Sequence, residues 1–235
     1  MDVFQERNLI VPTRRELFGG LFCWIAYLLL FPLLLSMLPF FQEDSLRSSF
    51  LYNLAVSVSC FILVLLVFRK FLYRSKLPMP LLLFTGFWGF LGAYGLNNLW
   101  GYFLQSLVMF LPVTPSNMNQ ETIDLFLRSY SLPMVLNVVI LAPVVEELLF
   151  RGAIFAPLCR QKGPVPAYIA SMVAFAALHV VSYIGQQHWL VILISFLEYL
   201  PAGLMLGWSY QRARSIWAPI VVHALLNLVS SMLIL

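Results

Sequence analysis

The apolar segment 142–153 contains three ionisable side chains close together: Glu146, Glu147 and Arg151. Each ionisable residue at membrane depth costs roughly 2.5–3.5 kcal/mol on insertion scales. A cluster of three such residues without a function would therefore make membrane insertion strongly unfavourable. Their presence in one hydrophobic segment predicts a functional site.

The spacing of these residues suggests different roles for the two carboxylates. Glu147 and Arg151 are four residues apart, so on a helix they share one face and can form an ion pair. Glu146 points about 100° away from Glu147, which leaves it free to react. Pro143 lacks a backbone N–H, which predicts a kink or a freed carbonyl near Glu146.

Other polar side chains also lie in apolar stretches. His179 and His223 are two such residues, and Asn227 follows His223 at the spacing of one helical turn. Two histidines, an amide and a carboxylate at membrane depth favour a functional site over packing. His188 is expected in a short turn outside this site. Glu198 allows two interpretations: it lines the same cavity, or it is a protonated structural group.

Two chemistries fit this set of residues. A carboxylate beside an imidazole can take a proton from water, here Glu146 with His179. His223 and Asn227 could then donate hydrogen bonds to the oxyanion of an attacked carbonyl. Alternatively, Glu146, His179 and His223 suffice as three protein ligands of a divalent metal such as zinc, which leaves one position for water. Both routes lead to hydrolysis of an amide.

The sequence gives little support to other intramembrane protease chemistries. It contains no H-E-x-x-H motif and no convincing pairing of a serine with a histidine. An aspartyl dyad is also missing, because every aspartate lies outside the apolar stretches: Asp2, Asp44 and Asp124.

Composition indicates a membrane protein. The chain is 61% hydrophobic and only 10% charged, whereas a soluble domain carries about 25% charged residues. We predict an all-α, polytopic integral membrane bundle of about seven to eight transmembrane helices in a single domain, residues 1–235. Seven segments are long enough to span the bilayer: 17–41, 50–68, 78–111, 132–158, 164–184, 189–210 and 215–235.

Two parts of the chain carry further expectations. Segment 78–111 is too long for one straight span, and its glycines at 86, 89, 92 and 95 are expected to allow close helix packing. Segment 112–131 is predicted to be the only sizeable polar loop. Its turn-forming and polar residues are Pro112, Pro115, Asn117, Asn119 and Gln120.

The basic residues predict the orientation. With a cytoplasmic N-terminus, eleven of the fourteen Lys and Arg residues lie in cytoplasmic segments and only Arg47 and Arg128 lie outside. This positive-inside bias places the C-terminus and loop 112–131 outside. The net charge of +4 is thus a topology signal, and no nucleic-acid partner is expected.

The depths of the polar residues agree with a shared site. Counted from the cytoplasmic ends of their helices, Glu146 lies about 13 residues deep, His179 about 15, Asn227 about 12 and His223 about 8. At 1.5 Å per residue their depths in the membrane therefore agree within roughly 10 Å. This agreement requires the fourth helix to continue past Arg151, so that Arg151 is buried with Glu147.

Three blocks of the sequence resemble the motifs of a known family. These are APVVEELLFRG at 142–152, FAALH at 175–179 and APIVVHALLN at 218–227. They look like the E-E-x-x-x-R, F-x-x-x-H and H-x-x-x-N/D motifs of the CPBP intramembrane proteases. This group comprises type II CAAX prenyl endopeptidases and bacterial Abi proteins. The resemblance covers about residues 130–230, which we take as the catalytic core.

The resemblance implies roles for the matching residues. Glu146 and His179 would activate water, while His223 and Asn227 would form the oxyanion site or help to hold a metal. Glu147 and Arg151 would support the site. A divalent metal such as zinc stays an open alternative, with Glu146 and both histidines as its ligands.

Two function hypotheses follow. The first is an intramembrane endopeptidase that cuts a membrane-associated peptide or protein, in CAAX-type processing, peptide maturation or bacteriocin immunity. The second is a non-proteolytic immunity or transport-assisting protein on the same fold. Membrane lipid and a peptide or protein substrate are the expected partners, and a bacterial plasma membrane is the expected location. The substrate and the oligomeric state do not follow from the sequence.

Overall fold

The structure is a computed structural model that describes residues 9–114 and 116–235, so Pro115 lies outside the described residues. Seven helical stretches are long and apolar enough to cross a membrane. Their bounds are Arg14–Ser36, Leu46–Arg74, Met79–Val108, Ser131–Lys162, Pro164–Tyr183, Trp189–Ala213 and Trp217–Ile234. The predicted polytopic helical bundle is confirmed, and all seven predicted spans are present.

Some spans are composed of several helices, because π-helical turns interrupt them. The α-helices are α1 (Arg14–Ile25), α2 (Phe31–Ser36), α3 (Leu46–Arg74), α4 (Met79–Val108), α5 (Met118–Ser129), α6 (Ser131–Leu136), α7 (Ala142–Glu147), α8 (Ala156–Lys162), α9 (Pro164–Val180), α10 (Trp189–Ala213) and α11 (Trp217–Ile234). The π-helical segments are Ala26–Leu30, Asn137–Leu141 and Leu148–Phe155. Within the described ranges there is no β-strand.

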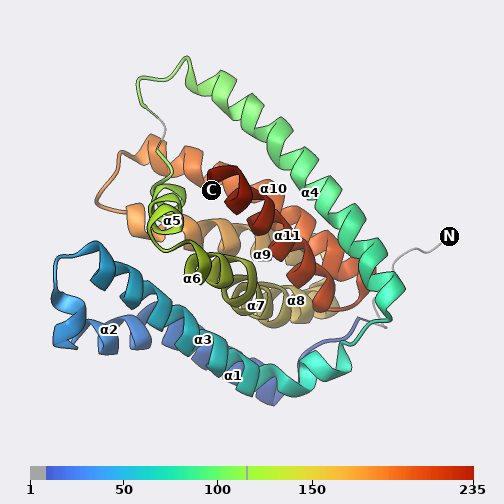
Figure 1. Ribbon diagram of the computed structural model, residues 1–235. Coiled ribbons are helices and arrows are strands. Elements are labelled where there is room, and N and C mark those ends of the chain that lie inside the picture. The colour runs from blue at the N-terminus through green and yellow to red at the C-terminus, as the bar shows by residue number, and fades with distance from the viewer. Residues whose placement is uncertain (1–8, 115) are drawn as a thin grey trace.

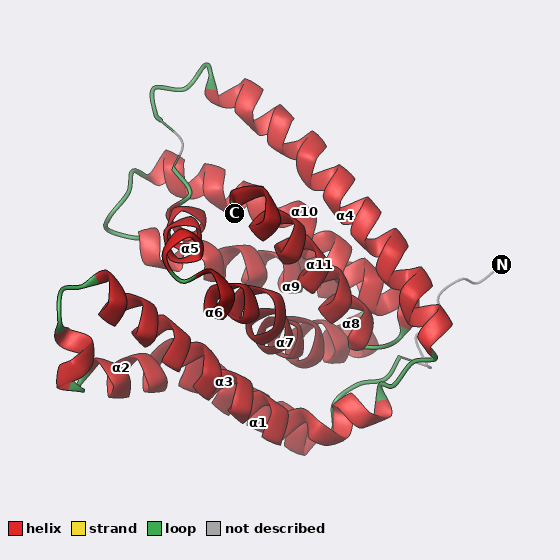
Figure 2. Cartoon of the chain, in the orientation of Figure 1, coloured by secondary structure: helices red, strands yellow, loops and turns green. Residues whose placement is uncertain are grey.

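The helices are arranged around the fourth span. In Figure 1, α1–α3 lie on one side, α4 lies on the opposite side, and α6–α11 fill the space between them. The helix α4 packs on α10 and α11, and α3 contacts α7. Figure 2 shows that short loops connect most of the helices. The fourth span, which carries the ionisable cluster, therefore has neighbours on several sides.

The fourth span is irregular because of its prolines. The N–H of Ala142 donates to the carbonyl of Asn137, five residues back, which is the π-helical register. The next carbonyl in that register belongs to Val138, and its donor would be the backbone N–H of residue 143. Residue 143 is proline and has no N–H, so the Val138 carbonyl is freed. The predicted freed carbonyl near Glu146 is therefore present.

The same pattern recurs twice. The N–H of Ala156 donates to the carbonyl of Arg151, and residue 157 is proline. The N–H of Phe31 donates to the carbonyl of Ala26, and residue 32 is proline. In each case a π-helical segment ends two residues before a proline.

Helix α4 is continuous over 30 residues. At 1.5 Å per residue it is about 45 Å long, longer than the roughly 30 Å of hydrocarbon that it must cross. Its glycines allow close packing as predicted, except at Gly95. A methyl group on Gly89 would come within 2.7 Å of Val222 in α11, but one on Gly95 would meet nothing within 4 Å.

The expectation of a polar loop at 112–131 is wrong for most of that segment, because it contains α5, a helix of 12 residues. Asn117 caps this helix, since its Oδ1 accepts from the N–H of Gln120 at 3.1 Å. Phe126 and Leu127 on α5 are buried against α3 and α6 residues. A side-chain cap and one buried face thus stabilise a helix despite the polar composition.

Candidate active site

The predicted ion pair is present and fully buried. Nη1 of Arg151 lies 2.9 Å from Oε1 of Glu147, and both side chains are 0% exposed. Nη2 of Arg151 donates to the carbonyl of Gly203 in α10 at 2.9 Å. The guanidinium also lies 4.9 Å from the centre of the Phe175 ring. The fourth span is thereby joined to α9 and α10 through a single arginine.

Glu147 has a second partner that the sequence reasoning missed. Nδ1 of His223 lies 2.8 Å from Oε1 of Glu147. A carboxylate only accepts hydrogen bonds, so Nδ1 carries the proton of this bond. Glu147 therefore links Arg151 to His223. No signal in the sequence could have found this contact, because it depends on how α11 is rotated against α7.

Glu146 lies between the two imidazoles. Its Oε2 is 3.8 Å from Nε2 of His179 and 3.9 Å from Nε2 of His223. Both distances exceed a hydrogen bond. The Oε2 atom is buried and has no hydrogen-bond partner in the structure. The expected meeting of His179 and Glu146 across neighbouring spans is therefore found.

The imidazole of His179 has a defined orientation. Its Nδ1 lies 2.8 Å from the carbonyl of Phe175. A carbonyl only accepts, so Nδ1 carries the hydrogen, and in the neutral ring Nε2 turns its lone pair toward Glu146. The ring is also stacked on Tyr199, with centroids 4.2 Å apart and planes at 28°. Tyr199 is a further site residue that sequence reasoning missed.

Tyr199 connects the site to the N-terminal end of α5. Its hydroxyl donates to Oδ1 of Asn117 and accepts from Nδ2 of Asn119, both at 3.1 Å. Tyr183 also donates to Oδ1 of Asn117, at 2.9 Å. Nδ2 of Asn117 donates to Oε2 of Glu198 at 2.8 Å. Together these residues form one hydrogen-bonded network: Asn117, Asn119, Tyr183, Glu198 and Tyr199.

Asn227 has a structural partner. Its Nδ2 donates to the carbonyl of Val138 at 2.7 Å, the carbonyl that Pro143 leaves without a donor. The amide nitrogen carries a second hydrogen, which is not needed for this bond. Asn227 and His223 both line the cavity that contains Glu146. The histidine outside the site, His188, instead caps α10 by accepting from the N–H of Leu190.

The cavity around these groups encloses about 540 Å³, which is within the usual range for a ligand site of about 300–1,000 Å³. Glu146, His179, His223 and Asn227 all line it, with Tyr27 on the first span. Glu198 lines it as well, so this glutamate is part of the same cavity. None of the described residues that line it is a Lys, Arg or Asp.

The described residues do not fit a metal site as they are placed. In the part of the chain that the structure describes, no three His, Cys, Asp or Glu side chains are grouped so that they could hold a metal ion. Two ligands of a tetrahedral zinc, each about 2.0–2.2 Å from the metal, are about 3.4 Å apart, and the Nε2 atoms of His179 and His223 lie somewhat farther than this from Oε2 of Glu146, at 3.8 and 3.9 Å. We assign no catalytic step to a metal.

A buried carboxylate between two imidazoles in a helical membrane bundle is an arrangement suited to activating water at membrane depth. Comparison with known proteins agrees with hydrolytic chemistry. Residues 128–229 match the family described as type II CAAX prenyl endopeptidase Rce1-like. The matched region includes the carboxylate pair, the arginine, both cavity histidines and Asn227.

A relative among the curated proteins is YdiL of Bacillus subtilis (strain 168), which is named as a proposed membrane peptidase. It is 23% identical over 197 residues, which cover 79% of this chain and 72% of the relative. No solved structure matches the chain. Over residues 128–229 the chain is therefore similar to CAAX-type intramembrane proteases, and its seven apolar helices support an integral membrane protein.

Proposed function

We propose that this protein is an intramembrane endopeptidase that hydrolyses a peptide bond in a membrane-associated peptide or protein. The observation that carries the proposal is the position of Glu146 between the Nε2 atoms of His179 and His223, at 3.8 and 3.9 Å. These separations are too long for a direct hydrogen bond, and one water molecule can bridge groups at such distances. The family supports the reaction class.

Water activation needs two acceptors that face the same point. Oε2 of Glu146 has no protein donor, and Nε2 of neutral His179 presents a lone pair because Nδ1 donates to Phe175. A water molecule between them can donate one hydrogen to each. The carboxylate then takes a proton as the water oxygen attacks the peptide carbonyl.

The developing oxyanion needs donors on the other side of the reacting carbon. His223 holds a hydrogen on Nδ1 against Glu147, so its protonated form donates from Nε2 into the cavity. The remaining N–H of Asn227 is a second donor. With His223 protonated, the positive charges of His223 and Arg151 equal the negative charges of Glu146 and Glu147. The cluster is then neutral in its apolar surroundings.

The tetrahedral intermediate collapses when its C–N bond breaks. The proton that Glu146 took from water passes to the leaving nitrogen, so that the products are a carboxylic acid and an amine. Glu146 and His179 return to their starting states. Glu147 and Arg151 take no part in the proton transfers; they hold His223 in its orientation and bind the helices together.

A metal-dependent route through Glu146, His179 and His223 is distinguished by chelation. We expect cleavage to survive dialysis against EDTA and 1,10-phenanthroline, because water activation by Glu146 and His179 needs no cation. Loss of cleavage that added zinc restores would instead support a divalent metal.

For the substrate, we propose a peptide or protein held at the membrane, in CAAX-type processing or in peptide maturation. The named relative comes from a bacterium, which supports a location in a bacterial plasma membrane. We place the N-terminus in the cytoplasm and the C-terminus outside, following the excess of basic residues on one side.

The test of the proposed function uses the purified protein in liposomes with a set of fluorescence-quenched membrane peptides. The wild type should release fluorescence and Glu146→Gln should not. A folded wild type that cleaves no peptide in a broad set would favour the alternative, a non-proteolytic immunity or transport-assisting protein.

A further inference from the structure

A second cavity lies between α4 and α10, beside the catalytic cavity. It encloses about 510 Å³, and we call it the α4–α10 groove. Its lining comprises Asn97, Asn98, Gly101, Tyr102, Leu104, Gln105, Val108, Ile194 and Glu198. Asn97, Asn98 and Glu198 also line the cavity that contains Glu146. The two cavities are therefore adjacent and share part of their walls.

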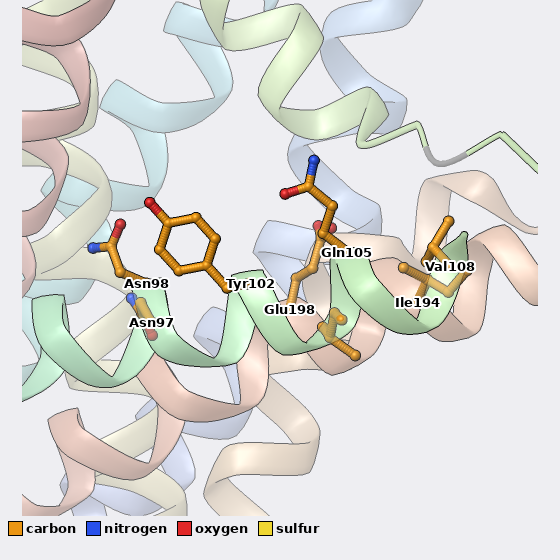
Figure 3. Close-up of a pocket in the computed structure, with 9 residues that line it drawn as sticks. Asn97, Asn98, Tyr102, Gln105, Val108, Ile194 and Glu198 are labelled. Atoms are coloured by element: carbon orange, nitrogen blue, oxygen red, sulfur yellow. The ribbon is translucent and has the colours of Figure 1, made fainter. Parts of the chain in front are cut away.

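The α4 wall of this groove is unusually polar for a membrane span. Asn98, Tyr102 and Gln105 project from the same side of α4 in Figure 3. All three side chains are exposed, although α4 is apolar enough to cross the membrane. Nδ2 of Asn98 donates one hydrogen to the carbonyl of Tyr94 at 2.8 Å, but lipid offers no partner for the remaining donors and acceptors of a carboxamide. This side of α4 therefore faces water or a polar ligand.

One polar atom in the groove has no partner. The Oδ1 atom of Asn97 is buried and accepts no hydrogen bond in the structure. The backbone around it is held firmly, because Nε1 of Trp100 donates to the carbonyl of Leu197 in α10 at 2.8 Å. A buried acceptor on a fixed helix is suited to receive a donor from a bound molecule.

The groove and the proposed reaction together indicate the ligand. An extended peptide presents one N–H and one C=O at each residue, and at membrane depth all of them need partners. A carboxamide offers both a donor and an acceptor. The amides of Asn97, Asn98 and Gln105 can therefore bind the backbone of a peptide chain that enters the catalytic cavity.

The charge of the groove indicates which side chain the peptide carries. Among the described residues, Glu198 is the only charged one that lines the groove, and Glu146 is the only other carboxylate that lines either cavity. Neither cavity has a Lys or Arg in its lining. A carboxylate with low-dielectric walls concentrates negative potential, which favours a cationic group.

We propose that the α4–α10 groove is the subsite for the substrate chain beside the scissile bond, and that Glu198 selects a Lys or Arg side chain there. This inference rests on the proposed function. Glu198 acts on substrate choice and takes no part in the proton transfers at Glu146.

The experiment uses quenched peptides that carry Lys, Gln or Glu at one position, moved stepwise away from the cleaved bond. At one position the wild type should cleave the Lys peptide about fivefold faster than the Glu peptide, the upper range for a partly exposed ion pair. Glu198→Lys should reverse that preference. Glu198→Gln should remove it, which serves as the test if the lysine variant does not fold.

Two matched controls separate charge from structure. Glu43→Lys makes the same charge change at an exposed position outside the groove and should keep the preference for Lys. Asn117→Ala removes the hydrogen bond to Glu198 but leaves its charge, and should also keep the preference. Cleavage without any charge preference, or a preference that persists in both Glu198 variants, would overturn the inference. If the wild type cleaves no peptide at all, the proposed function itself fails.

Discussion

The adjacent carboxylates at the end of α7 should respond in opposite ways to substitution. Glu147 and Arg151 have no exposed side-chain surface and form a 2.9 Å ion pair. In Arg151→Met, Glu147 keeps only His223 as a partner, and the carbonyl of Gly203 loses its donor. Removing one partner of a buried pair costs about 3–5 kcal/mol. Both Arg151→Met and Glu147→Gln should therefore destabilise the fold.

The expected shift can be expressed as a melting temperature. For a chain of this size, 1 kcal/mol corresponds to about 2–4 °C, so the loss is roughly 6–20 °C. Glu146→Gln keeps the size of a side chain whose Oε2 has no protein partner. Its melting temperature should stay within about 2 °C of the wild type. Its kcat should fall by about 10²–10⁴-fold, the usual contribution of a positioned acid or base.

The assay pairs thermal unfolding in detergent with peptide cleavage, measured for every variant. Glu43→Gln is the matched control, because it makes the same change at an exposed glutamate and should alter neither quantity. The reasoning is refuted if Glu146→Gln melts many degrees lower while Glu147→Gln melts like the wild type and only loses activity. That result would mean that the two carboxylates have exchanged roles.

Three further predictions concern the site and the topology. Tyr199→Phe should keep the ring stacked on His179 and retain most of the kcat. Tyr199→Ala should lower kcat more than it raises KM. If the two variants had equal kcat values, Tyr199 would have no role in positioning His179. Asn227→Leu should lower the free energy of unfolding by about 1–3 kcal/mol, because the Val138 carbonyl loses its donor; an unchanged denaturant midpoint would contradict this. The three native cysteines are buried, so a cysteine introduced at exposed Ser129 should react with an impermeant thiol reagent in intact cells. One at exposed Gln161 should react only after lysis, and the opposite pattern would invert the proposed orientation.

Several features of the site could be predicted from the sequence because they depend on local spacing. The four-residue step from Glu147 to Arg151 holds in the structure, although a π-helical segment begins between them. The depth of His179 in its span predicts its approach to Glu146, since depth depends only on helical rise. The seven spans follow from apolar run length, which the thickness of the bilayer dictates.

Other contacts could not be predicted, because they depend on how helices are rotated and packed. The bond from His223 to Glu147 and the stacking of Tyr199 on His179 join different spans, and hydropathy carries no information on such pairings. Helix α5 was missed for a different reason. Its composition is that of a loop, and only the Asn117 cap and a buried pair of apolar residues make it helical.

The fourth span is synthesised before the residues of α11 that form hydrogen bonds with it. Glu147 and His223 are separated by 76 residues, and Val138 and Asn227 by 89. At about 5–20 residues per second, translation of α11 follows that of the fourth span by roughly 4–18 s. Until α11 has inserted, the Val138 carbonyl has no donor and Glu147 lacks its histidine. The candidate site is therefore complete only after α11 reaches the membrane.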